Sequence, residues 1–100
     1  MAKAKLLSNE NGVADTVVIQ CPGCQCWHPF AIAPSAHPRG LTWTFNNDLE
    51  RPTFTPSLDC NRDDPKTRCH SIVTDGKIQF VPGCYHSLDG QTIDLPDIED

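Results

Sequence analysis

The sequence lacks a long apolar run and any block of basic residues, and each absence excludes a class of protein. No segment approaches the roughly 20 apolar residues that a membrane-spanning helix needs, and residues 1–8 lack the apolar stretch of a signal peptide. Eight Lys and Arg stand against 13 Asp and Glu, for a formal net charge of −5. Phosphate backbones favour basic surfaces, so nucleic-acid binding is disfavoured. We therefore expect a cytoplasmic protein without a membrane partner.

The chain also has few residues with which to build a core. Its 100 residues correspond to one small domain, of which 38% are hydrophobic and nine are Pro. Chains of this size bury a low fraction of their surface, and many depend on disulfides or a bound metal. Six Cys are compatible with either. In the reducing cytoplasm, paired Cys more often bind metal, so we expect a metal.

No segment has a helical period, whereas several have the period of two that is typical of strands. Residues 16–20 are rich in β-branched side chains and predict a strand. Leu41, Trp43 and Phe45 alternate with polar residues and predict a half-buried strand. Residues 50–55 are its predicted partner, at a sheet edge because of their prolines.

Two Asp-Gly pairs predict hairpins in the C-terminal third. The pair at 75–76 separates the apolar runs 69–74 and 77–81, and the pair at 89–90 predicts a second hairpin within residues 85–95. The fold class is therefore all-β: a small zinc-ribbon-like domain of antiparallel hairpins, or a meander, with long loops.

The predicted organisation is a single β domain with two polar ends. Residues 1–15 are expected to be a flexible N-terminal arm, residues 16–96 a zinc-stabilised β domain, and residues 97–100 an acidic tail. A Pro- and Asp-rich stretch at 56–68 is expected to be a long loop.

The spacing of Cys21 and Cys24 is the strongest metal signal, because a tight Pro-Gly turn lets two thiolates reach one ion. Two further ligands must come from residues 69–86. In the hairpin register Val73 opposes Ile78, which places Cys69 on the core face and His70 on the other. The preferred set for one Zn²⁺ is Cys21, Cys24, Cys69 and His86, and the alternates are His70 and Cys84.

Other Cys and His residues exceed the four positions of a closed site. Cys26 and His28 leave a second ion open, and Cys60 is expected to be a free thiol. A rubredoxin-like iron site is disfavoured because the chain has no second Cys-x-x-Cys pair.

Several motifs follow one another in order: Trp-Thr-Phe-Asn-Asn at 43–47, Arg-Pro-Thr-Phe-Thr-Pro-Ser-Leu at 51–58, Cys-His at 69–70, Thr-Asp-Gly-Lys-Ile-Gln-Phe at 74–80, Cys-x-His at 84–86 and Gln-Thr-Ile-Asp-Leu-Pro at 91–96. This order resembles a family of small proteins common in bacteriophages and prophages, some of them labelled ammonia monooxygenase. Nothing in the chain supports a membrane-bound copper oxygenase, so we set that label aside. The resemblance implies a metal-binding β domain of phage origin with no established activity, and it stresses Cys69, His70 and His86.

These features favour a zinc-binding phage or prophage accessory protein that acts as a protein-interaction module. Its partner would be a host or phage protein, in the host cytoplasm if the chain is phage-encoded. One alternative is a metal-dependent hydrolase with His70 or Asp59 among the candidate bases. A thiolate-rich set argues against it, since strong donors weaken a metal as a Lewis acid. A zinc-ribbon nucleic-acid binder is the second alternative. The sequence names no catalytic residue and favours the absence of enzymatic activity.

Overall fold

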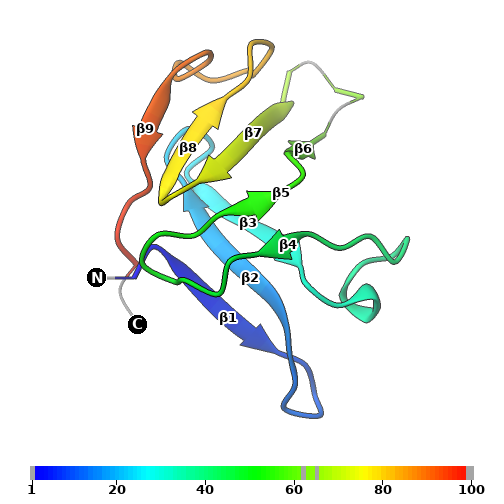
Figure 1. Ribbon diagram of the computed structural model, residues 1–100. Coiled ribbons are helices and arrows are strands. Elements are labelled where there is room, and N and C mark those ends of the chain that lie inside the picture. Colours follow the sequence, from blue (N-terminus) through cyan, green and yellow to red (C-terminus); the bar gives the residue numbers. More distant parts are fainter. Residues whose placement is uncertain (1, 62, 65, 99–100) are drawn as a thin grey trace.

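The computed structural model describes residues 2–61, 63–64 and 66–98, and these residues confirm the all-β class (Figure 1). Their strands form three antiparallel sheets, joined by loops and one short 3-10 turn, η1 (Pro34–Ala36). No helix in this part of the chain is long and apolar enough to cross a membrane. The sheets consist of β1 (Ala4–Ser8), β2 (Ala14–Cys21) and β3 (Cys26–Ala31); β4 (Thr44–Phe45) and β5 (Phe54–Thr55); and β6 (Leu58–Cys60), β7 (Cys69–Thr74), β8 (Lys77–Phe80) and β9 (Thr92–Asp94).

The first sheet begins earlier than the sequence predicts. Residues 1–15 are expected to be an arm, yet β1 pairs with β2 from Ala4 opposite Ile19 to Ser8 opposite Ala14. Ala4 is buried, and its N–H donates to the carbonyl of Leu49. The segment is therefore ordered by contacts with residues distant in sequence, which a local polar composition does not reveal.

The β7–β8 hairpin has the register that the sequence predicts. Val73 opposes Ile78 and Ser71 opposes Phe80, and Cys69 shares the buried face with Val73, Ile78 and Phe80. The loop predicted at 56–68 contains one more strand, β6, which pairs with β7 through Asp59 opposite His70. A strand of three residues is too short for a periodicity to be visible in the sequence.

The second hairpin prediction is wrong, because residues 85–88 form turns and no strand. The Asp89 carboxylate accepts hydrogen bonds from the N–H groups of Gly83 and Cys84, both at 2.9 Å. These bonds tie Asp89 back to residues 83 and 84, so the chain between them turns back instead of extending. The following strand, β9, pairs with β8 instead, with Ile93 opposite Ile78.

The aromatic centre of the core joins the first two sheets. Phe54 is buried and stacks on Phe30, with ring centroids 3.9 Å apart, and on Phe45, at 5.0 Å. These ring contacts hold β5 against the first sheet, and β6 begins shortly after β5 along the chain. Trp43 packs edge-on against Phe30 at 5.7 Å.

The described segments nearest the two chain ends meet beside the start of β1 (Figure 1). Ile98 is buried and its N–H donates to Ala2, while Asp97 forms an ion pair with Lys3 at 3.5 Å. Of the predicted acidic tail, residues 99–100 lie outside the described residues.

Candidate functional site

A serine and a histidine meet where β6 begins beside β7. The Ser57 hydroxyl oxygen lies 2.8 Å from Nε2 of His70, within hydrogen-bond distance. His70 turns away from the core because side chains alternate along β7, and its neighbours Cys69 and Ser71 are both buried. Both members of the pair are half-buried. The arrangement is the one in which an imidazole can take a proton from a hydroxyl.

The backbone of each member is held by a side chain from another segment. The Trp43 indole N–H donates to the carbonyl of Ser57 at 3.3 Å. The Cys84 sulfur accepts from the His70 N–H at 3.3 Å and donates to the His70 carbonyl at 3.3 Å. The pair is therefore positioned by tertiary contacts as well as by the strand register.

An ion pair stands on the same face of the sheet. Asp59 opposes His70 in the register, and its two carboxylate oxygens accept from Arg68 at 3.1 and 2.9 Å. Hydrogen bonding to Asp59 raises the pKa of the Arg68 guanidinium. Bidentate geometry makes this pair directional, so it fixes the side chains beside His70.

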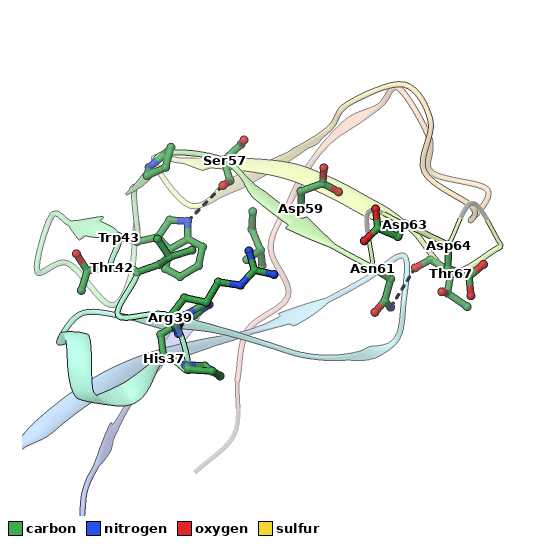
Figure 2. A pocket seen from close by; sticks show the side chains of 14 residues that line it. His37, Arg39, Thr42, Trp43, Ser57, Asp59, Asn61, Asp63, Asp64 and Thr67 are labelled. Atoms are coloured by element: carbon green, nitrogen blue, oxygen red, sulfur yellow. Dashed lines mark hydrogen bonds between the residues drawn. The ribbon is translucent and has the colours of Figure 1, made fainter.

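Ser57 also lies in the wall of an open cleft of about 930 Å³. Figure 2 shows Arg39 extending into the cleft, with Trp43 and Ser57 towards one end and Asp63 and Asp64 towards the other. The cleft thus offers charged side chains and an aromatic ring beside Ser57.

A separate cluster of sulfur and nitrogen atoms lies on the buried side of β7, the side that carries Cys69. The ligand atoms of Cys21, Cys24, His28 and Cys69 all lie within 4.8 Å of one another. A second group of the same kind contains Cys69, Cys84 and His86. Both arrangements could hold a metal ion, and three of the four predicted ligands, Cys21, Cys24 and Cys69, meet in the first group.

The electrostatics of the first group favour a positive charge at its centre. A hydrogen bond between Cys21 and Cys69 lowers the pKa of the Cys21 thiol and raises that of Cys69. Burial lowers the pKa of His28, but the sulfur atoms of Cys21 and Cys60 outweigh burial and raise it to about 11. Cys69 and His28 thus hold their protons more strongly than usual, whereas Cys21 loses its proton more readily.

The other predicted ligands have different surroundings. Nε2 of His86 lies 3.4 Å from the Cys69 sulfur, whereas His70 is engaged with Ser57. The Cys84 sulfur is bonded to the His70 backbone, and it belongs to the second group. Cys26 is exposed, and Cys60, expected to be a free thiol, lies with its sulfur 3.5 Å from Nδ1 of His28.

The comparison with protein families gives one result. A family model described as BubE, bacterial ubiquitination-like system serine protease, matches residues 1–81. The chain belongs to the BubE family. Comparison with curated proteins and with solved structures finds no match. Membership in BubE fits the expected small bacterial family, whereas it specifies neither a phage origin nor the ammonia monooxygenase label.

The sequence does not predict the Ser57–His70 contact. Its two members are 13 positions apart, and the contact depends on β6. The one sequence feature that points to His70 is the register of the β7–β8 hairpin, which places His70 on the face opposite the core and Cys69. The identity of its partner needs the fold.

Proposed function

We propose that the chain is a serine peptidase of a bacterial ubiquitination-like system, with Ser57 as the nucleophile and His70 as the general base. The observation that carries this proposal is the 2.8 Å contact between the Ser57 hydroxyl and Nε2 of His70. The printed description of the BubE family as a serine protease supports it independently. This reverses the preference that the sequence alone gives for a protein without enzymatic activity.

The reaction is acyl transfer in two halves. The Ser57 oxygen attacks the carbonyl carbon of the scissile bond, and His70 takes the hydroxyl proton at Nε2. The carbon–nitrogen bond then breaks, and the leaving amine departs with that proton. In the second half, water gives a proton to His70 and its oxygen to the acyl group, and Ser57 regains its proton. Such base catalysis contributes about 10²–10⁴-fold in rate.

The surroundings of the pair suit a protein substrate. Ser57 lines the open cleft of about 930 Å³, and an extended polypeptide bound there would lie beside this residue. Trp43 and Cys84 hold the two backbones in place before substrate arrives. Preorganisation of this kind lowers the cost of reaching the transition state.

The metal, which we propose to be zinc, has a structural role in this account. The candidate ligands are mostly thiols, and Cys21 and Cys69 are buried. Closed, thiolate-rich sites are typical of structural zinc. A metal-dependent hydrolase using His70 is disfavoured because His70 contacts Ser57. A phage or prophage origin and a location in the cytoplasm remain part of the proposal, on the strength of the sequence.

A protein-interaction module is the second candidate function, with a host or phage protein as its partner. Trp27 and Tyr85 are 49% and 45% exposed, and exposed aromatic residues often anchor protein interfaces. This function does not need the Ser57 hydroxyl, which separates it from the first.

The test is incubation of the purified chain with the ubiquitin-like protein of the same system, alone and in conjugates, followed by gel electrophoresis and mass spectrometry. We expect cleavage by the wild type and by Ser35→Ala, an exposed serine control in η1, and none by Ser57→Ala. Equal cleavage by Ser57→Ala would refute the peptidase assignment. Binding without cleavage by the wild type would favour the interaction module.

A further inference from the structure

We infer that the fourth ligand of the metal centre is His28, so that Cys21, Cys24, Cys69 and His28 form one closed Cys₃His site. The sequence prefers His86 in this position. The argument concerns the chain's own donor atoms and does not depend on peptidase activity.

The geometry fits one tetrahedral ion. The four ligand atoms lie within 4.8 Å of one another, and a tetrahedral zinc with bonds of about 2.3 Å to sulfur needs them roughly 3.8 Å apart. The Cys24 N–H donates to the Cys21 sulfur at 3.3 Å, which stabilises a thiolate there. A small inward movement of side chains therefore closes the site.

His28 has the surroundings expected of a metal ligand. It is only 5% exposed, and its Nε2 has no hydrogen-bond partner among the described residues. An unsatisfied buried nitrogen of this kind destabilises the fold, and a metal bond would satisfy it. Its other nitrogen, Nδ1, lies 3.5 Å from the Cys60 sulfur. Metal-binding histidines commonly use the second nitrogen in this way, which fixes the ring and its tautomer.

Both ring nitrogens of His86 are engaged in a pattern that opposes metal binding. Its Nδ1 accepts a hydrogen bond from the Leu88 N–H at 3.3 Å. An imidazole that accepts at Nδ1 carries its proton on Nε2, and that Nε2 lies 3.4 Å from the Cys69 sulfur. His86 therefore donates to the sulfur of a ligand from outside the site. Its ring lies over Gly23, where an added Cβ would be within 2.3 Å of it.

The assigned site joins two sheets. Cys21 and His28 lie in β2 and β3, Cys24 lies in the turn between them, and Cys69 begins β7. One ion would thus connect the first sheet to the strand that carries His70. If the proposed function holds, loss of the ion displaces the general base.

The experiment measures metal content by elemental analysis and the absorption spectrum of the Co²⁺-substituted chain. The variants are His28→Cys and His86→Gln, with the wild type as reference. We expect one metal per wild-type chain and a spectrum typical of three sulfurs and one nitrogen. His28→Cys should keep the metal and shift to a four-sulfur spectrum, because cysteine can replace the ligand without emptying the site. His86→Gln should keep both stoichiometry and spectrum.

Any other combination overturns the assignment. A spectrum that changes in His86→Gln and is unchanged in His28→Cys would identify His86 as the ligand, and a folded, metal-free wild type would remove the site altogether. Cys60→Ala provides a further readout: it should weaken metal affinity about 10–100-fold, as loss of an outer partner does, without changing the spectrum. None of these readouts uses peptidase activity, so they are independent of the proposed function.

Discussion

Replacing Ser57 and His70 by alanine, singly and together, tests whether the two residues act as a unit. Their 2.8 Å contact means that each works through the other. Loss of the pair should lower kcat about 10⁴-fold, which corresponds to ~5.5 kcal/mol at about 1.36 kcal/mol per tenfold. Each single variant should show this loss, because His70 acts only by taking the Ser57 proton and Ser57 attacks slowly while it keeps that proton.

The double variant distinguishes independent contributions of Ser57 and His70 from a shared one. If the two side chains acted independently, their losses would multiply to about 10⁸-fold, whereas members of one catalytic unit lose no more together than singly. We expect the double variant to match either single variant within about tenfold. The assay is kcat and KM for cleavage of the ubiquitin-like protein, with circular dichroism to show that each variant is folded.

Two results would refute this reasoning. His70→Ala with kcat close to that of the wild type would remove His70 as the base. Multiplicative losses would show that Ser57 and His70 contribute separately, so that their contact is not the catalytic one.

Three further variants test the positioning of the site. Phe54→Ala should lose about 3–5 kcal/mol of unfolding free energy in urea titration, because Phe54 stacks on Phe30 and Phe45; a loss no larger than that of Phe54→Leu would contradict this packing. Gly23→Ala should lower Tm because its Cβ would be within 2.3 Å of the His86 ring, and adding His86→Ala to that variant should restore the Tm. An unchanged Tm in Gly23→Ala would be evidence against the contact. Cys84→Ala should lower kcat about tenfold with KM and metal content unchanged, because its sulfur holds the His70 backbone; loss of metal instead would make Cys84 a ligand.

The parts of the fold that depend on local signals are predictable from the sequence. The Asp75-Gly76 turn fixes the register of β7 and β8, and that register places Cys69 inward and His70 outward. Residues 50–55 are the predicted partner of the strand around Phe45, and Phe54 opposes Phe45 in the structure. Spacing makes Cys21 and Cys24 predicted ligands, and they lie in one group with Cys69.

The parts that depend on distant contacts are not predictable in this way. Strand β1 is ordered by β2 and by the Leu49 carbonyl, and residues 85–88 are curled by the Asp89 side chain. The Ser57–His70 pair needs β6, whose three residues carry no periodicity. A hydroxyl on an extended segment is an ordinary surface feature until the fold brings a histidine to it. The Thr53 hydroxyl, just before β5, accepts from the Asp75 N–H instead.

The identity of the nucleophile can be measured directly by treating the folded chain with a fluorophosphonate and mapping the modified peptide by mass spectrometry. Such reagents phosphonylate serines whose hydroxyl is activated by a neighbouring base. We expect one modification, on Ser57, that is lost in Ser57→Ala and strongly slowed in His70→Ala. Modification of another residue, or none in a chain that cleaves its substrate, would contradict the assignment of Ser57 as the nucleophile.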